Sequence, residues 1–379
     1  MTTWLKENLK GDYQIWTIIA ALSIISVIVV ASASGRLVIQ SNGAIFFHVV
    51  KHTAYMCFGL GAMWFFHRFD YHKIANYSNI GVFLSIALLL YAYKFEHGIN
   101  NANRWIHLGG MTFMPSDIAK LSLITNLASM LARRQHLEYT FKDVLPMAVK
   151  IIIVCGCIAL TNVSTSVLLF ATCFLLMFIG RVPVNFLAMT LAGIFMFGTI
   201  LVMTGTGSRI ETARNRIANY VNNIKGKKKK DADKDADYQI ERSYFAIANG
   251  GIAGKGPGKS QQRYFLSESE SDFIYAIIIE EWGMLGGLFV LILYLWLLYR
   301  GMKAVDSSGR AFGGLLSAGL TFSLVIQAMV HMGVATGLGP VTGQPLPLLS
   351  MGGSSLLFTG AMIGIIISVS KDKVKDAIL

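Results

Sequence analysis

The chain has 379 residues, of which 54% are hydrophobic and 14% are charged, and its formal net charge is +12. Soluble domains carry about 25% charged residues, so this composition excludes an ordinary soluble protein and indicates an integral membrane protein. The positive charge would also fit a nucleic-acid-binding protein. In a membrane protein, however, basic cytoplasmic loops account for it, and we expect no nucleic-acid partner.

Apolar runs predict about ten transmembrane helices in an all-α membrane protein, and we treat residues 1–379 as a single membrane domain. The predicted helices span residues 14–34, 46–66, 74–93, 116–133, 144–161, 164–180, 184–204, 273–299, 312–333 and 353–370.

The distribution of Lys and Arg predicts the orientation. With the N-terminus inside, the inner segments hold 14 basic residues and the short outer loops hold three, which are Arg36, Lys94 and Arg104. This asymmetry follows the positive-inside rule and predicts that both termini are cytoplasmic.

The same topology places residues 205–272, between the seventh and eighth helices, in a large extracytoplasmic loop. Within it, the low-complexity tract 225–237 reads KGKKKKDADKDAD and predicts a solvated spacer. Binding of lipid headgroups or of a partner by this tract is the alternative.

Ionisable residues inside a membrane domain are functional candidates because burying them is costly. Lys51, Asp117, Lys120, Glu280 and Glu281 all fall in or near the outer halves of predicted helices. We interpret them as lining a hydrated cavity that opens outward. Asp117 and Lys120 are three residues apart and share a helix face, so a self-neutralised structural pair is the alternative.

Two outer segments are rich in Gly and Pro. Residues 250–260, GGIAGKGPGKS, lack the strand and helix of a phosphate-binding Walker loop, and a mobile hinge fits them equally well. Residues 337–355 hold three of the seven prolines and predict a re-entrant or capping loop over the outer face.

The order and wording of several long motifs resemble the SEDS family (shape, elongation, division and sporulation), and its division-type FtsW branch more than its elongation-type RodA branch. These motifs include NRWIHLGGMTFMPSDIAKLSL (103–123), FLSESESDFIYAIIIEEWGMLGG (265–287) and GLGPVTGQPLPLLSMGGSSLL (337–357). The chain departs from the family pattern at Ser267, Glu270, Ser271, Asp117 and Met351.

The resemblance implies a peptidoglycan glycosyltransferase that polymerises lipid II during division, with a class B penicillin-binding protein and other divisome membrane proteins as partners. It implies that the protein spans the bacterial cytoplasmic (inner) membrane, at the division site. No cofactor is expected, and the sequence does not decide whether a divalent cation takes part.

By motif position, Asp272 corresponds to the family's essential aspartate, and Arg104, Lys120 and Asp117 belong to its polar cavity. Our hypothesis is that Asp272 deprotonates the acceptor hydroxyl while Lys120 and Arg104 neutralise the departing undecaprenyl pyrophosphate, in an inverting displacement. Asp272 also fits a helix N-cap, which is the structural alternative.

Three further residues are candidates for substrate binding: Lys51, Glu281 and Ser354. Of Glu280 and Glu281, we expect one to face the cavity and the other to hydrogen-bond within the bundle. Gln327 and His331 share a helix face, and a core hydrogen bond is the favoured interpretation of them.

Two other classes of function remain open. A transporter that flips lipid II would also need a polar cavity, but the outer location of the ionisable residues and the lack of a visible internal repeat disfavour it. A scaffold for division proteins would not need Asp272 for growth. An elongation-type polymerase is the alternative within the same family.

Overall fold

The computed structural model describes residues 10–34, 45–95, 105–108, 111–135, 137–203, 208–224, 234–266 and 269–371. Each of the ten predicted ranges coincides with a helix. These ten helices are α2 (Tyr13–Ala33), α4 (Ile45–Arg68), α5 (Tyr71–Phe95), α6 (Pro115–Ala132), α7 (Phe141–Ala159), α8 (Val163–Ile179), α9 (Val184–Met203), α12 (Ile274–Ser307), α13 (Ala311–Ala335) and α14 (Gly353–Ser370).

By length and composition, five of the described helices could cross a membrane, namely α2, α5, α12, α13 and α14. Two shorter apolar helices span Val163–Ile179 and Val184–Ile200. The structure therefore confirms a mainly helical membrane protein. The ten-span topology itself stays a prediction.

Local chemistry explains several helix starts. Asp12 caps α2, because its Oδ1 accepts a hydrogen bond from the Gln14 amide at 2.9 Å. Thr140 and Asp143 form a capping box at the start of α7. Pro115 occupies the first turn of α6, where its missing N–H leaves no helix bond unmade.

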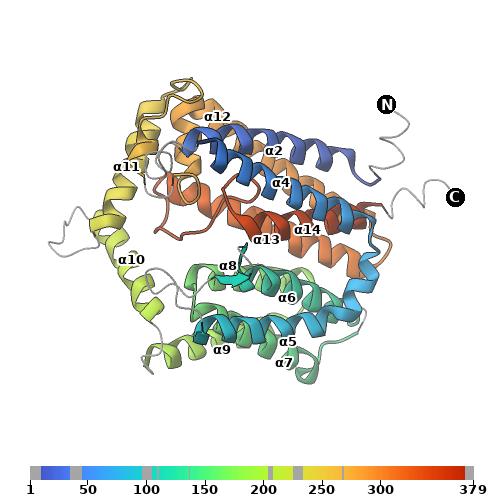
Figure 1. Ribbon diagram of the computed structural model, residues 1–379. Coiled ribbons are helices and arrows are strands. Elements are labelled where there is room, and N and C mark those ends of the chain that lie inside the picture. The colour runs from blue at the N-terminus through green and yellow to red at the C-terminus, as the bar shows by residue number, and fades with distance from the viewer. Residues whose placement is uncertain are drawn as a thin grey trace.

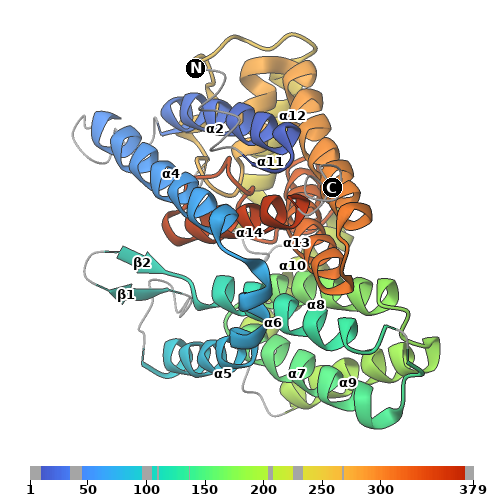
Figure 2. The ribbon, with the colours of Figure 1, turned by 90° about the vertical axis from the view of Figure 1, so that its right-hand side faces the viewer.

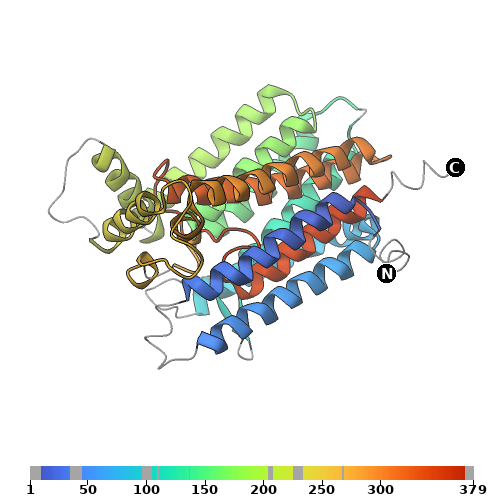
Figure 3. The ribbon, with the colours of Figure 1, turned by 90° about the horizontal axis from the view of Figure 1, so that it is seen from above.

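The helices run side by side, with α13 at the centre of the bundle (Figures 1 and 2). α13 packs against α12, α6, α8 and α14, while α4 lies along α14 and α5 lies along α6. The first and last described residues lie at one end of the bundle, and the two helices of the 205–272 segment lie at the other end (Figures 1 and 3).

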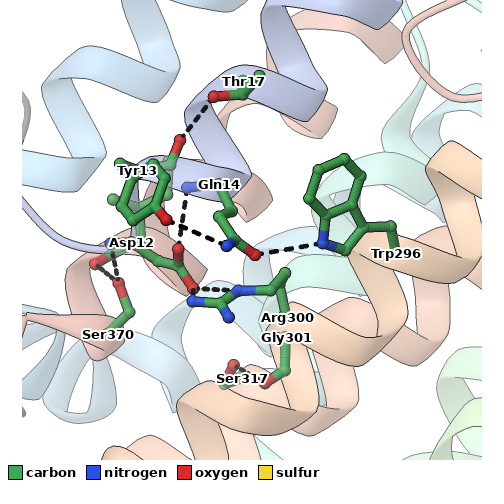
Figure 4. Close-up of polar contacts among 10 residues, drawn as sticks. Asp12, Tyr13, Gln14, Thr17, Trp296, Arg300, Gly301, Ser317 and Ser370 are labelled. Atoms are coloured by element: carbon green, nitrogen blue, oxygen red, sulfur yellow. Dashed lines mark hydrogen bonds and ion pairs between the residues drawn. The ribbon is translucent and has the colours of Figure 1, made fainter.

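Partly buried polar contacts hold the start of α2 at that first end. Arg300 of α12 donates from Nε to Asp12 Oδ2 at 2.6 Å, and the Asp12 amide donates to Ser370 Oγ at 3.0 Å (Figure 4). Trp296 Nε1 donates to Gln14 Oε1 at 3.2 Å. These contacts join the first helix to the ends of α12 and α14.

The described chain contains elements that sequence analysis did not anticipate. A short antiparallel hairpin pairs β1 (Ile106–Leu108) with β2 (Met111–Phe113), with Ile106 opposite Phe113. The segment 205–272 contains α10 (Ser208–Ile224) and α11 (Lys234–Gly250). These two helices are amphipathic and rich in charge, so a search for apolar runs passes over them.

Within the charged tract 225–237, residues 225–233 lie outside the described part of the chain, and α11 begins at Lys234. The prediction that the tract is a solvated spacer therefore stays a prediction.

Candidate functional site

A buried, non-helical segment between α13 and α14 forms the centre of the candidate site. Gln344, Leu346, Leu349 and Ser350 are all at most 3% exposed. Irregular backbone inside a membrane domain is tolerated only where its polar groups are satisfied by protein or face a water-lined cavity.

Four carbonyl oxygens of this segment accept hydrogen bonds from side chains of three different helices. The donors are His331 Nδ1 to Gln344 O (2.8 Å), Gln327 Nε2 to Pro345 O (2.8 Å), Tyr294 OH to Pro347 O, and Ser26 Oγ to Leu349 O (3.0 Å). The helical bundle therefore holds the segment along its length. Gln327 and His331 share a helix face and form core hydrogen bonds, as predicted. Their acceptors are the Pro345 and Gln344 carbonyl oxygens of this segment.

The backbone at Leu348 is in the left-handed region, with φ at 65°. A β-carbon makes this conformation costly, by roughly 1–3 kcal/mol, so it persists only where the surroundings impose it. Strained backbone of this kind is most common at functional sites. Here the strained residue lies three residues before Met351, whose amide donates to Glu270 O, two residues before Asp272.

Asp272 lies immediately before α12, and this segment positions it. Ser350 Oγ donates to Ser271 O at 2.7 Å, and the Met351 amide donates to Glu270 O at 2.9 Å. Ser271 Oγ in turn donates to Asp272 Oδ1 at 3.2 Å. Residues about 80 positions apart in sequence thus fix the backbone on which the Asp272 carboxylate stands.

The structure does not use Asp272 as a helix cap. The N-cap of α12 is Phe273, and no side-chain hydrogen bond caps this helix. Asp272 is partly exposed. Because the Gln344 carbonyl can only accept, His331 Nδ1 carries a proton, and Nε2 has no hydrogen-bond partner among the described residues.

Asp117 and Lys120 form the predicted pair. Lys120 Nζ lies 3.0 Å from Asp117 Oδ1, and both side chains are at least nine-tenths buried. Lys120 also donates to Gln327 Oε1 at 3.2 Å. Gln327 therefore links the ammonium to the Pro345 carbonyl, which belongs to the same segment that positions Asp272.

Asp117 Oδ2 is a second buried polar atom without a hydrogen-bond partner in the described part of the chain. Buried polar atoms without partners are uncommon and ask for an explanation. In the neutral imidazole with its proton on Nδ1, Nε2 accepts, as Asp117 Oδ2 does, so hydroxyl groups of a bound molecule would supply partners for both atoms.

Glu280 and Glu281 hold the Gly-rich segment 250–260. Glu280 is fully buried. Its carboxylate accepts hydrogen bonds from Ser260 Oγ at 2.5 Å and from Lys255 Nζ at 3.4 Å. It also accepts from the Gln261 and Gln262 amides, both at 3.2 Å. The segment is therefore held along the bundle by these bonds, which a freely mobile hinge would lack.

Glu281 is also buried, where it accepts from Ser32 Oγ and from the Ser260 amide, the latter at 3.3 Å. These contacts give Glu281 a role in positioning the loop. Both glutamates therefore hydrogen-bond within the bundle, and Glu280 also pairs with Lys255, whose Nζ lies 3.4 Å from Glu280 Oε1.

Of the other predicted residues, two lie on α4 and α14 and one lies outside the described chain. Lys51 is exposed on α4, with Nζ 5.9 Å from the centre of the Tyr55 ring. Ser354 starts α14, where its Oγ accepts from the Met114 amide at 3.1 Å, next to the start of α6. Arg104 lies outside the described residues.

Sequence analysis also overlooked residues that matter to this site and to the bundle. Gln344 donates to Thr165 Oγ1 at 2.8 Å, which ties the segment to α8. Lys150, in the middle of α7, donates to Asn79 Oδ1 at 2.7 Å and to Asn126 Oδ1 at 2.9 Å. A basic residue inside an apolar run was a signal that could have identified Lys150.

Within the described ranges, no three His, Cys, Asp or Glu side chains gather as they would around a metal ion. Asp272 offers a carboxylate, Lys120 a buried ammonium and His331 an imidazole, and hydrogen bonds connect all three to the 344–351 segment.

Comparison with known proteins places this chain among membrane-embedded cell cycle proteins. A family model described as cell cycle protein, which covers FtsW, RodA and SpoVE, matches residues 12–375. Stage V sporulation protein E of Bacillus subtilis (strain 168) is 30% identical and is aligned over 98% of this chain and 99% of its own length.

Two other relatives are named "Probable peptidoglycan glycosyltransferase FtsW". The protein from Bacillus subtilis (strain 168) is 31% identical, with 97% of this chain and 92% of its own length aligned. The protein from Geobacter metallireducens (strain ATCC 53774 / DSM 7210 / GS-15) is 32% identical, with 97% and 96% aligned.

Two solved structures share the fold. A chain described under "Structural coordination of polymerization and crosslinking by a peptidoglycan synthase complex" has a TM-score of 0.75 at 22% identity, covering 97% of this chain and 99% of that one. The rod shape determining protein RodA of Thermus thermophilus has a TM-score of 0.69 at 23% identity, covering 98% and 99%.

Proposed function

The chain belongs to the FtsW, RodA and SpoVE family of cell cycle proteins, and we propose that it is a peptidoglycan glycosyltransferase that polymerises lipid II into glycan strands. Relatives that are 31–32% identical over nearly the whole chain carry the name peptidoglycan glycosyltransferase. The structural observation that supports this proposal most directly is that Asp272 and the Lys120 ammonium are both connected to the 344–351 segment.

In the proposed reaction, Asp272 acts as the general base. Its carboxylate takes the proton of the acceptor sugar hydroxyl, the hydroxyl oxygen bonds to the anomeric carbon of the donor, and the bond from that carbon to undecaprenyl pyrophosphate breaks. The electron pair leaves with the pyrophosphate. A single displacement inverts the α-linked donor to a β-linked product and needs one carboxylate on the attacking side.

Lys120 is the group we propose for the leaving pyrophosphate, together with Arg104. A cation held in place before the reaction stabilises developing negative charge without reorganisation. Asp117 at 3.0 Å and Gln327 at 3.2 Å restrict the Lys120 ammonium, which supports this role.

The decisive test is polymerisation by the purified protein, with its partner transpeptidase and labelled lipid II, read out as glycan product on a gel. We expect Asp272→Ala to abolish the polymer. Asp306→Ala is the matched control, because this exposed aspartate lies near the other end of α12 and should keep full activity. Movement of lipid II across vesicles without any polymer from the wild-type protein would instead identify a transporter.

We further propose that the cognate partner is a class B penicillin-binding protein and that the pair works in septal wall synthesis. A chain of the same fold comes from a structure described as a peptidoglycan synthase complex that coordinates polymerization and crosslinking. The FtsW names of the relatives favour division. A tagged copy should gather at midcell; lateral-wall localisation would favour elongation.

For the membrane topology we propose that the end carrying both termini is cytoplasmic. Arg68, Lys73, Arg133, Arg300 and Lys371 all lie at or near that end of their helices, which supports the positive-inside orientation. Labelling of single-cysteine variants from outside the cell tests this. A cysteine at Ser308 should be protected, and one at Lys259 should react.

A further inference from the structure

A cavity with two arginines in its lining lies at the opposite end of the bundle from Asp272. Its volume is about 340 Å³, within the range of about 300–1,000 Å³ that is typical of small-molecule sites. The cavity is lined by α5, by the end of α6 and by the start of α13. Because Asp272 precedes α12 and Arg310 follows it, the whole length of α12 separates the two sites.

The lining is cationic. Arg133 follows α6 and Arg310 precedes α13, and both line the cavity together with His72 and Ser129. Among the described residues, no acidic side chain lines the cavity, and neither arginine has an ion-pair partner. The neighbouring Arg134, by contrast, lies 2.7 Å from Asp143.

His72 adds a hydrogen-bonding group to this lining. Asp70 Oδ1 accepts from the His72 backbone amide at 3.0 Å and from Nδ1 at 2.8 Å. These hydrogen bonds hold the pKa of Asp70 below its usual value, so the carboxylate is charged at neutral pH. The His72 Nε2 atom is buried and has no hydrogen-bond partner within the described chain.

The start of α13 contributes backbone donors. Arg310 is the N-cap of α13, and no side chain caps this helix, so the amides of Ala311 and Phe312 lie at an open helix N-terminus on the cavity wall. Helix N-termini favour anions, and arginine recognises phosphate by paired hydrogen bonds. An anionic, phosphate-bearing group fits this combination.

An exposed apolar strip on α5 indicates where the rest of such a ligand lies. Phe83 and Leu90 follow His72 by 11 and 18 residues, close to three and five helical turns, so all three lie in line along the helix. Their side chains are 70% and 47% exposed. A ligand with a headgroup in the cavity can therefore lay acyl chains on this strip.

We propose that this cavity binds the phosphate headgroup of an anionic phospholipid from the leaflet next to the termini, with Arg133 and Arg310 as its phosphate ligands. Basic pockets between membrane helices at the cytoplasmic side are suited to anionic headgroups. Because the ligand would contact α5, α6 and α13 together, it would join the α5–α6 pair to the central helix.

Native mass spectrometry of the full-length protein in detergent tests the site, with phosphatidylglycerol and phosphatidylcholine as probes. We expect the wild-type protein to retain phosphatidylglycerol at least about tenfold more tightly than phosphatidylcholine. Arg133→Gln/Arg310→Gln should lose this preference. Lys142→Gln/Arg181→Gln is the matched control, because it removes two exposed charges at the same end of the bundle and should keep the preference.

The conservative pair Arg133→Lys/Arg310→Lys keeps both charges and should retain part of the preference, and it provides a folded comparison if the Gln pair does not fold. An equal loss of the phosphatidylglycerol preference in Arg133→Gln/Arg310→Gln and in Lys142→Gln/Arg181→Gln would overturn the site. Inorganic phosphate is the competitor that tests the lipid assignment. If it displaces phosphatidylglycerol as well as a phospholipid does, the site binds a soluble phosphate and the lipid assignment is overturned. Neither outcome depends on glycosyltransferase activity.

Discussion

Gly283, within α12, lies so close to Gly254 of the Gly-rich segment that a β-carbon on either residue would stand 2.5 Å from the backbone nitrogen of the other. Gly283 has φ at 71° and ψ at −175°, a conformation open essentially only to glycine, and it kinks the helix. The two glycines let the 250–260 segment dock on α12 just after Glu280 and Glu281.

Gly283→Ala should therefore destabilise the protein by about 3 kcal/mol or more, because backbone strain and a clash with the Ile252 carbonyl act together. Thermal unfolding in detergent measures this. Gly198→Ala in α9 is the control: its β-carbon would meet nothing within 4 Å, and alanine favours the helix by about 1 kcal/mol. A Gly283→Ala protein as stable as the control would contradict the docking model.

Lys120→Met should lower the rate of polymerisation by about 10²–10³-fold, because the cation proposed for the leaving pyrophosphate is lost. It should also destabilise the fold, since Asp117 would be left buried without its partner at 3.0 Å.

The double variant Asp117→Asn/Lys120→Met separates these two effects. Removing both charges should restore much of the stability and none of the activity. Recovery of polymerisation in the double variant would show that the pair is only structural.

Ser350→Ala should slow polymerisation by about tenfold while changing lipid II affinity little. The substitution removes the donor to Ser271 O and the acceptor of the Leu346 amide, both at 2.7 Å, and so loosens the backbone beside Asp272. Small misplacements of a reacting group are costly in rate. Kinetics of Ser350→Ala and of Ser350→Thr, which keeps the hydroxyl, give the comparison.

Ser85→Ala serves as the control for that series, because Ser85 Oγ donates only to Val82 O of its own helix. A Ser350→Ala enzyme with the same maximal rate as Ser85→Ala would exclude a positioning role for Ser350.

Stability should rise with pH above about 8 because of Lys371, which follows α14. Burial, together with repulsion from Lys10 and Arg68, lowers the pKa of Lys371 from its usual 10.5 to about 8. Between these two values the unfolded chain binds the proton and the folded chain releases it, so this group favours the folded state progressively as the pH rises through that window.

Unfolding temperatures at pH 7 and pH 9.5 test this prediction in Lys371→Gln and in the wild-type protein. The wild-type protein should gain stability relative to the variant at the higher pH. The exposed Lys142→Gln should show no such change relative to wild type, and a constant difference for Lys371→Gln would refute the prediction.

The helices of this protein could be predicted because each depends on a local pattern. An apolar run such as residues 353–370 must bury its backbone polar groups, and a helix does this within the run itself. The same local logic paired Asp117 with Lys120, which are one helical turn apart. It failed for α10 and α11, whose apolar residues occupy only one face of each helix.

The sequence alone thus determined that this is a helical membrane protein, and its motifs pointed to the family and to Asp272. Only the tertiary structure decided what surrounds that aspartate. The hydrogen bond from Ser350 to Ser271 and the one from Ser26 to Leu349 join residues 79 and 323 positions apart. No local periodicity records such pairs, because they form only when separate helices pack together and must satisfy the buried carbonyls between them.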